Sequence, residues 1–314
     1  MTFLHKAKLL MAGAVAVTAL GLATAQAAEK FDLSPDTSNR VRAEKNEEAI
    51  KALSPDFKFV TPGKFTVAIN AWDPPIATFA NDAKTIVGAD PDLATLLADS
   101  LGLEVEIVSV AWADWPLGVS SGKYDAVISN VTVTEERKEK FDFSTYRKDV
   151  LGFYVKADSP ITEIKDPKDV AGLKVITGAG TNQEKIILEW DRQNVAAGLK
   201  PVEVQYFDDR AAAELALSSG RADVEFNPNA TLAYGSAVKG QTKLVGIVSG
   251  GWPLTAEIAV TTRKGAGLAD AVTVAINGLV KSGKYGEVLK RWNLEAEGID
   301  QSFTNPAGLP KSGS

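Results

Sequence analysis

Two stretches of the chain, residues 64–128 and 174–226, repeat one order of secondary structure. Apolar periodicity predicts strand, helix, strand, helix and strand in each of them. In both stretches a helix ends in Ser-Gly and a basic residue, and an aspartate opens the last strand, in the sequences SGKYDAV and SGRADVE. Because strands that alternate with helices form parallel or mixed sheets, the repeat predicts an α/β protein with two similar lobes.

The order of the remaining strands predicts how the lobes are joined. A strand at 151–155 leaves the first repeat and a strand at 258–262 follows the second, so we expect two strand crossings between the lobes. An amphipathic helix is expected at 41–53, ahead of the repeats. The predicted segments are a signal peptide (1–27), an N-terminal extension (28–60), lobe 1 (61–152 plus 257–297), lobe 2 (153–256) and a C-terminal tail (298–314).

The first 27 residues have the pattern of a secretory signal peptide. His5, Lys6 and Lys8 form a basic start, an apolar run at 9–23 follows, and Ala-Gln-Ala at 25–27 offers a cleavage site. The apolar run is short and rich in small residues, which disfavours the alternative of an uncleaved membrane anchor. We therefore expect the mature protein in the periplasm.

Composition excludes several kinds of chemistry. The 314-residue chain has no cysteine, and its one histidine, His5, lies in the predicted signal peptide. Disulfides, thiol nucleophiles, histidine metal sites and Ser-His-Asp triads are therefore not expected in the mature protein. Cleavage would remove two of the 34 basic residues and none of the 40 acidic ones, which changes the formal charge from −6 to −8. This charge argues against nucleic acid or an anionic membrane as a partner.

Residues 125–144, DAVISNVTVTEERKEKFDFS, contain the first candidate binding group. A strand and a short polar segment lead to a helical turn, for which Thr134 is a suitable N-cap. Glu135 and Glu136 suit the positive end of a helix, whereas Arg137 opposes the helix dipole there. A cation in this position is either a solvated surface charge or an anion site, and this stretch by itself leaves both readings open.

A second candidate lies between the first strand and first helix of the second repeat, in the sequence GAGTNQE at 178–184. A dinucleotide-binding loop would need a glycine where Gln183 stands, and the Gly-Lys-Ser/Thr of a phosphate-binding loop is absent. What remains is a helix start with free N–H groups, either a modest anion site or only a capped turn.

Four tryptophans, Trp72, Trp112, Trp115 and Trp252, fall in loops or at strand ends. Each could wall a ligand pocket, although core packing is the default expectation for any one of them. Paired carboxylates such as Glu135 and Glu136 sit at helix starts, where capping accounts for them. No spacing of acidic residues indicates a metal, and no cofactor is expected.

Taken together, the motifs resemble the polar amino acid-binding proteins of bacterial ABC importers. The resemblance covers about residues 61–295. Its most specific parts are Thr134 and Arg137 followed by Phe-Asp-Phe-Ser at 141–144, and the paired SGKYDAV and SGRADVE turns. The other matching segments are 63–69, 74–75, 88–94, 101–102, 131–133, 180–184 and 281–292.

The resemblance implies two α/β lobes that close on a small ligand, the type II periplasmic binding protein fold. It implies that Arg137 binds the ligand's α-carboxylate through both guanidinium nitrogens. The helix start at Thr181 and Asn182 would bind the same carboxylate from lobe 2. Asn130 and Thr132 would line the lobe 1 side of the pocket, together with Trp112 at a position that usually faces the ligand side chain.

The sequence departs from the family pattern in three places. An aspartate is usual where Asn70 stands, and an aromatic residue usually precedes the two prolines, where this chain has Asp73 after Trp72. The lobe 2 aspartate that normally binds the α-ammonium would fall at Pro228. Because a buried ammonium without an anionic partner is costly, either Asp73 replaces this aspartate, with Asn227 as a neutral helper, or the ligand lacks a free α-amino group.

These observations predict a monomeric periplasmic protein that captures an amino acid or a similar small carboxylate and delivers it to the permease of an ABC importer. Ligand binding by hinge closure, without catalysis, is the expected mechanism. The alternatives are a dehydratase-like enzyme on the same fold and a ligand-sensing module. An enzyme without histidine or cysteine would have to use residues such as Asp73 or Glu225.

Overall fold

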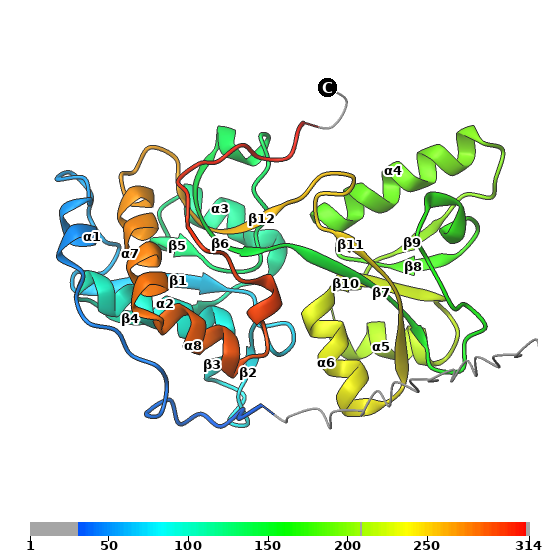
Figure 1. Cartoon of the computed structure of the whole chain (residues 1–314), viewed down its shortest axis with the longest axis horizontal. Helices are drawn as coiled ribbons and strands as arrows, with labels where there is room; N and C mark the ends of the chain where they lie inside the picture. Colours follow the sequence, from blue (N-terminus) through cyan, green and yellow to red (C-terminus); the bar gives the residue numbers. More distant parts are fainter. Residues whose placement is uncertain (1–30, 208, 312–314) are drawn as a thin grey trace, which may run out of the picture.

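The two repeats form two five-stranded sheets in the computed structural model, which describes residues 31–207 and 209–311 (Figure 1). The strand order is β4-β1-β5-β12-β6 in lobe 1 and β11-β7-β10-β8-β9 in lobe 2. Both sheets are mixed, since β1 pairs in parallel with β4 and β5 while β12 runs antiparallel to its neighbours. The predicted two-lobe α/β fold is thereby confirmed.

The elements of lobe 1 are β1 (Lys64–Ile69), β4 (Glu104–Ser109), β5 (Ala126–Val127), β6 (Phe141–Lys148), β12 (Glu257–Arg263), the small pair β2 (Thr78–Phe79) and β3 (Ile86–Val87), and the helices α1 (Glu47–Lys51), α2 (Ala89–Leu101), α3 (Trp115–Ser120), α7 (Ala269–Ser282) and α8 (Lys284–Arg291). Lobe 1 also contains the short 3-10 turns η1 (Trp112–Asp114), η2 (Arg137–Glu139) and η4 (Glu295–Glu297). The helices α2 and α7 bury their apolar faces against this sheet, so lobe 1 has a core of its own.

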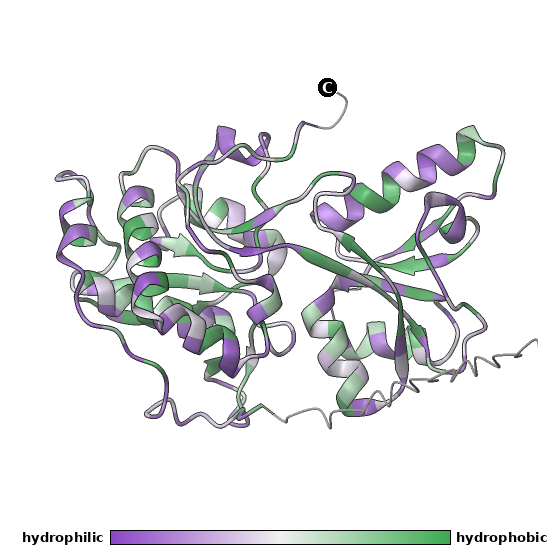
Figure 2. Ribbon diagram, in the orientation of Figure 1, coloured by the Kyte–Doolittle hydropathy of each residue, from purple (hydrophilic) through white to green (hydrophobic). Residues whose placement is uncertain are grey.

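The elements of lobe 2 are β7 (Val150–Lys156), β8 (Lys174–Ile176), β9 (Glu203–Gln205), β10 (Val224–Pro228), β11 (Thr242–Ser249), η3 (Pro167–Val170), α4 (Asn182–Ala196), α5 (Arg210–Ser218) and α6 (Asn229–Lys239). The core of this lobe stacks Phe153 on Phe226 at 4.0 Å between ring centroids, with Trp190 of α4 beside them. Figure 2 shows apolar residues along the central strands of both sheets. Each lobe therefore buries an independent apolar centre.

The repeated aspartates have one structural task in both lobes. Asp125 accepts hydrogen bonds from the backbone N–H groups of Val60 and Thr66, at 2.8 Å each, and so ties β5 to β1. Asp223 accepts from the N–H of Lys174 at 2.8 Å and ties β10 to β8. The SGKYDAV and SGRADVE turns are similar because each must fasten the last strand of its repeat to the first strand of the same repeat.

The chain passes between the lobes twice. It changes sheet first at Asp149, between β6 and β7, and again between β11 and β12. The two crossings lie side by side, because the N–H of Asp149 donates to the carbonyl of Ala256 and the N–H of Gly250 donates to the carbonyl of Asp149. The predicted lobe boundary at residue 152 falls inside β7, three residues after this change of sheet.

Several local expectations differ from the structure. The helix predicted at 41–53 is only Glu47–Lys51, because Asn46 caps it and the preceding residues run along α2, with the N–H of Ala43 donating to Asp99. Sequence reasoning assigned no strand to β6 or β11 and no helix to α6. β6 and β11 are the outer strands beside the crossings, and tertiary pairing sets their length more than local pattern does.

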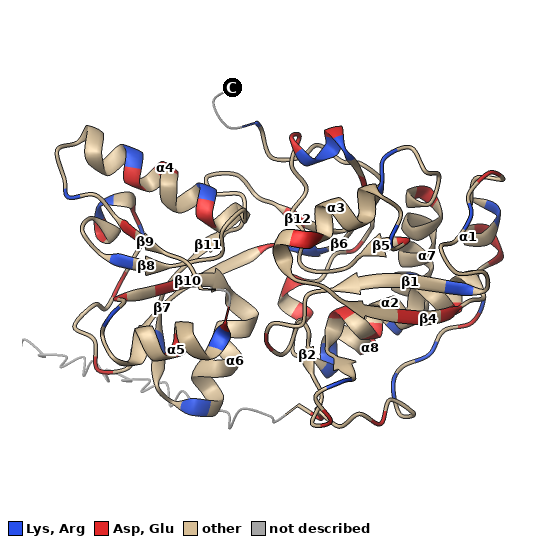
Figure 3. Cartoon of the chain, turned by 180° about the vertical axis from the view of Figure 1, so that it is seen from behind, with Lys and Arg blue, Asp and Glu red and all other residues tan. Residues whose placement is uncertain are grey.

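The N-terminal extension, from residue 31 onward, packs on lobe 1 through Arg40, whose guanidinium lies over the ring of Trp292 at 5.3 Å. The predicted signal peptide lies outside the described residues. Within the part of the chain that the structure describes, no helix is long and apolar enough to cross a membrane. Acidic and basic residues are spread over both lobes (Figure 3).

Candidate ligand-binding cleft

A cavity of about 610 Å³ lies between the lobes. Lobe 1 contributes the ends of β1 and β5 and the turn that carries Arg137, and lobe 2 contributes the loop before α4 and the end of β10. The structure brings all ten residues predicted for the site to the lining of this one cavity. They are Asn70, Trp72, Asp73, Trp112, Asn130, Thr132, Arg137, Thr181, Asn182 and Asn227.

Arg137 is a half-buried cation in the wall of the cavity. Its Nη1 donates to the carbonyl of Thr132 at 2.9 Å and its Nη2 to the carbonyl of Gly180, across the cleft, at 3.3 Å. Among the described residues no carboxylate lies within ion-pair distance of this guanidinium. Burial lowers the pKa of Arg137 to about 10, so the side chain stays charged at neutral pH and leaves its charge for an anion.

The turn around Arg137 forms as the sequence predicts. The hydroxyl of Thr134 accepts from the backbone N–H of Arg137 at 3.1 Å, and the guanidinium lies over the rings of Trp112 and Trp115 at 5.8 and 6.0 Å. Trp115 is a core residue, 3% exposed, whereas Trp112 is half-buried at the cavity. The two tryptophans hold the guanidinium on one side.

Lobe 2 presents hydrogen-bond donors to the same cavity. Thr181 is the N-cap of α4: its hydroxyl accepts from the N–H of Glu184 at 3.2 Å and donates to the carbonyl of Gly178. Asn182, the first residue of α4, is 7% exposed, and its Nδ2 has no hydrogen-bond partner among the described residues. A buried amide without a partner is costly, and Asn182 lines the cavity, so its amide is a candidate donor for a ligand.

Thr177 was missed by sequence reasoning. It follows β8 directly, lines the cavity, and is 2% exposed, and its hydroxyl also has no partner in the described chain. Its position at the carboxyl end of a parallel strand was the available signal. Ser129, Gln183, Phe207 and Thr231 also line the cavity and were not predicted as ligand contacts.

Three of the predicted lobe 1 residues use part of their hydrogen-bonding capacity within the protein. Asn70 donates from Nδ2 to the carbonyl of Val110 at 3.0 Å. Thr132 donates its hydroxyl proton to Asp149 at 2.8 Å, and Asn130, held at φ +53°, accepts from Arg147. The remaining capacity of these side chains is acceptance by the Thr132 hydroxyl, donation by the Asn130 amide, and, at Asn70, acceptance by Oδ1 and donation of the second amide hydrogen.

Among the described residues, Asp73 is the one acidic side chain that lines the cavity, and it is already paired. Its Oδ2 accepts from Nε of Arg210, on α5 of lobe 2, at 3.0 Å. Its Oδ1 makes no hydrogen bond within the described part of the chain. Burial raises the pKa of Asp73 to about 6, against the opposing charge of Arg210. The carboxylate is thus oriented by Arg210 and keeps one oxygen for another cation.

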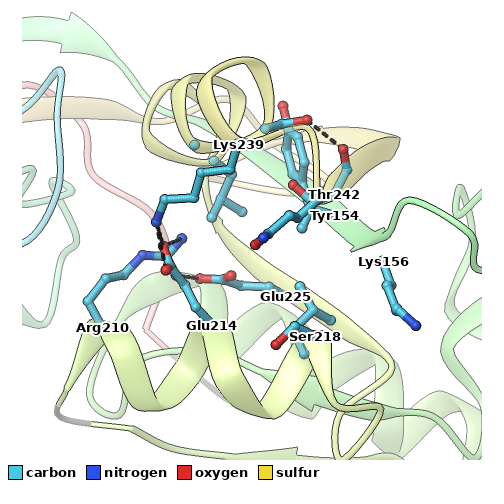
Figure 4. Close-up of a pocket in the computed structure, with 13 residues that line it drawn as sticks. Tyr154, Lys156, Arg210, Glu214, Ser218, Glu225, Lys239 and Thr242 are labelled. Carbon is cyan, nitrogen blue, oxygen red and sulfur yellow. Dashed lines mark hydrogen bonds and ion pairs between the residues drawn. The ribbon is translucent and has the colours of Figure 1, made fainter.

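Behind Asp73, Arg210 belongs to a larger network in lobe 2 (Figure 4). Its Nη1 donates to Glu225, 2% exposed, at 2.5 Å, and its Nη2 lies 3.3 Å from Glu214, which also pairs with Lys239. Burial raises the pKa of Glu225. Glu225 also accepts from Nδ2 of Asn227 at 3.1 Å, so the network fixes the Asn227 amide at the cavity.

Pro228, the last residue of β10 and the N-cap of α6, lines this end of the cavity. Among the described residues no carboxylate lines the cavity here, where the resemblance implied an ammonium partner in lobe 2, and Asn227 beside Pro228 is held by Glu225 and by Nε2 of Gln183 at 3.2 Å. That Asp73 replaces this partner stays a prediction.

The lobes touch on both sides of the cavity. Besides the Asp73–Arg210 pair, Lys185 of α4 lies 2.5 Å from Glu136 of lobe 1. The hydrogen bond from Arg137 to Gly180 crosses the same gap. These contacts describe a closed arrangement of the two lobes around the cavity. No cluster of three or more acidic, histidine or cysteine side chains fit to hold a metal occurs in the described residues.

Comparison with known proteins now identifies the family. The sequence model of the bacterial extracellular solute-binding proteins, family 3, matches residues 65–295, most of the chain. The chain belongs to this family. It is 33% identical over 232 residues to the L-cystine-binding protein TcyJ of Escherichia coli K12, a match that covers 73% of this chain and 82% of TcyJ.

Two solved structures support the assignment. An ancestral arginine-binding protein bound to arginine superposes with a TM-score of 0.65 at 29% identity, covering 73% of this chain and 98% of that one. The ancestral amino acid-binding protein AncCDT-1, described as a precursor of cyclohexadienyl dehydratase, superposes with a TM-score of 0.63 at 27% identity, covering 73% and 95%. Both structures are of amino acid-binding proteins, and the second is described as the precursor of an enzyme.

Proposed function

We propose that the protein captures an amino acid, or a closely related small carboxylate, in the periplasm and delivers it to the permease of an ABC importer. The observation that carries the proposal is Arg137, a cation without an ion pair in the described structure, facing the partnerless donors of Asn182 and Thr177 across the cavity. Groups from both lobes that need one anion make closure depend on that anion. The names of the relatives, which bind cystine, glutamine or arginine, point to the same class.

The proposed orientation places the ligand carboxylate between Arg137 and the start of α4, and an ammonium group at Oδ1 of Asp73. Trp72, Trp112 and Phe207 would wall the remaining space, since they line the cavity with largely apolar surface. Asp73 suits the ammonium because Arg210 orients its carboxylate through the other oxygen. The alternative ligand, a carboxylate without a free amine, would leave Oδ1 of Asp73 to water.

A thermal-shift screen over amino acids, their N-substituted or decarboxylated relatives and small organic acids tests this function. A true ligand at a hundredfold excess over its Kd should stabilise the protein by about 2.7 kcal/mol.

Arg137→Met should weaken carboxylate binding by about a hundredfold, because a charge-assisted contact is lost. The control is Arg192→Met, which removes an exposed arginine on α4. Equal affinity in both variants would contradict the proposal.

The ammonium contact needs its own measurement. The affinities of the selected amino acid and of its des-amino analogue are compared in the native protein and in Asp73→Asn. If Asp73 binds the ammonium, the variant loses more affinity for the amino acid than for the analogue. Any effect of Asp73 on lobe closure lowers both affinities alike, so the double difference isolates the ammonium contact.

A second candidate function is catalysis on a small carboxylate. It is favoured by the likeness to a dehydratase precursor and by the raised pKa values of Asp73 and Glu225, two carboxylates at or behind the cavity. We infer binding without turnover, because Arg210 pairs with both of these carboxylates. Prolonged incubation with the selected ligand, followed by mass spectrometry, separates the two functions: an altered ligand would establish an enzyme.

A further inference from the structure

The chain continues past the family match, which ends at residue 295, and the segment up to residue 311 lies along lobe 1 beside β6 (Figure 1, red). We name residues 303–311 the C-terminal strap. The strap forms no helix or strand, yet two isolated bridges, Ser144 with Thr304 and Thr134 with Leu309, fix its path. The second bridge places it directly beside the turn that carries Arg137.

One half of the strap is fastened to β6. The N–H of Thr145 donates to the carbonyl of Phe303 at 3.2 Å, and the N–H of Asn305 donates to the carbonyl of Phe143 at 2.9 Å. The side chain of Asn305 both accepts and donates: its Oδ1 accepts from the N–H of Phe143 and its Nδ2 donates to Asp142, each at 2.9 Å. This half anchors the strap to the sheet.

The other half surrounds the Arg137 turn. Leu309 donates from its N–H to the carbonyl of Val133 at 3.0 Å and accepts at its carbonyl from the N–H of Glu135 at 2.8 Å. The N–H of Gly308 donates to Oε1 of Glu135 at 2.7 Å. On the far side of Arg137, Nζ of Lys138 donates to the carbonyl of Pro306 at 2.8 Å. The strap therefore contacts the chain on both sides of Arg137 and leaves its guanidinium to the cleft.

The fit is close at Gly308. A Cβ there would lie 2.8–2.9 Å from backbone atoms of Thr134 and Glu135, so any side chain would push the strap away from the turn. Leu309 also packs against Gly251, in the second crossing between the lobes, where a Cβ would lie 2.7 Å from the leucine side chain. The strap thus joins the Arg137 turn to the hinge region.

We propose that the C-terminal strap is a positioning element that holds the Arg137 turn in its binding geometry. The turn is short, and the strap supplies backbone hydrogen bonds that the turn does not make internally. A guanidinium that must meet a carboxylate bidentately tolerates little displacement. The effect on ligand affinity rests on the function proposed above, whereas the effect on the turn does not.

The test uses Gly308→Ala in the mature chain, with a truncation after Ser302 as a second variant. The matched control is Gly286→Ala, because a Cβ at Gly286 meets nothing within 4 Å. Hydrogen exchange of the amides at 133–138 is the readout that needs no ligand. Exchange at Glu135, whose N–H donates to Leu309, should rise by about tenfold in Gly308→Ala and stay unchanged in the control.

Affinity for the amino acid selected by the screen should fall about tenfold in Gly308→Ala. The same substitution in an Arg137→Lys background should cost much less, because the contact that the strap positions is already impaired. Unchanged exchange at 133–138 would overturn the proposal. So would faster exchange with unchanged affinity, or a loss of affinity that is fully additive with Arg137→Lys. If no ligand binds even the native protein, the proposed function fails while the exchange result still decides whether the strap holds the turn.

Discussion

At the scale of single residues, Thr177 offers a clean experiment. Its hydroxyl is buried at the cavity and has no partner in the described structure. The hydroxyl of Thr66 in β1 is also buried without a described partner, but Thr66 does not line the cavity. Replacing either by valine keeps the shape and removes an unsatisfied polar group, so neither variant should lose stability. Thr177→Val should weaken ligand binding by about fivefold to tenfold, a lost neutral hydrogen bond. Thr66→Val should bind normally in the same titration, and equal affinities would remove Thr177 from the site.

Asp149, at the first crossing, makes stability depend on pH. It is 3% exposed, accepts from Thr132, and faces Arg147, Glu297 and Arg137. Burial raises its pKa from 3.8 to about 6. Between these two values the folded protein binds a proton that the unfolded chain does not, so stability falls as the pH rises from about 4 to about 6 and then levels off.

Asp149→Asn should remove this contribution, which is at most about 3 kcal/mol at roughly 1.4 kcal/mol per pKa unit. The measurement is urea denaturation of the native protein and the variant at pH 5 and pH 7. The native protein should lose more stability than the variant over this interval. Parallel losses would mean that Asp149 does not titrate there. Asp73 and Asp90, also with pKa values near 6, contribute with the same sign in both proteins.

At the scale of elements, the five-residue helix α1 is too short to be stable alone and depends on its cap. The side chain of Asn46 accepts from the N–H groups of Glu48 and Ala49 at 3.1 Å, and Ala49 is fully buried against lobe 1. Asn46→Ala should lower the free energy of unfolding by about 1 kcal/mol. Asn46→Asp keeps the accepting oxygens and should cost much less. Chemical denaturation measures both, and an alanine variant of unchanged stability would show that packing against α2 and α7 holds the helix without the cap.

The same scale explains which elements sequence reasoning found. β1, β8 and β10 lie inside their sheets, and β4 is an edge strand that belongs to the first repeat. The apolar runs of all four strands are bounded by turn residues. β6 and β11 carry the chain to the crossings, and pairing with β12 and β7 sets their length. No local signal in the sequence distinguishes such a strand from a loop, because its partners are more than 80 residues away in the chain.

At the scale of the whole molecule, two ion pairs between described residues join the lobes. Asp73 and Arg210 are mostly buried, whereas Glu136 and Lys185 are largely exposed. Because salt screens exposed charges, the Glu136–Lys185 pair contributes little to holding the lobes together. We expect Asp73→Asn to shift the unliganded protein toward an open form and Glu136→Gln to leave it nearly unchanged. Small-angle X-ray scattering without ligand would record this as a larger radius of gyration in Asp73→Asn alone. Equal radii would show that the Asp73 pair does not bias closure.

The two lobes and the family resemblance can be predicted from the sequence alone, since repeat order and turn residues are local properties. The sequence also predicts Arg137, Asn182 and eight further candidates that the structure places around one cavity. Which polar groups remain available to a ligand is visible only in the folded protein. Asp73 is paired with Arg210, the Thr177 hydroxyl has no partner among the described residues, and residues 303–311 lie against the Arg137 turn. These facts depend on which residues, distant in the chain, come into contact in the fold. The sequence around one residue does not reveal its hydrogen-bond partner elsewhere in the chain.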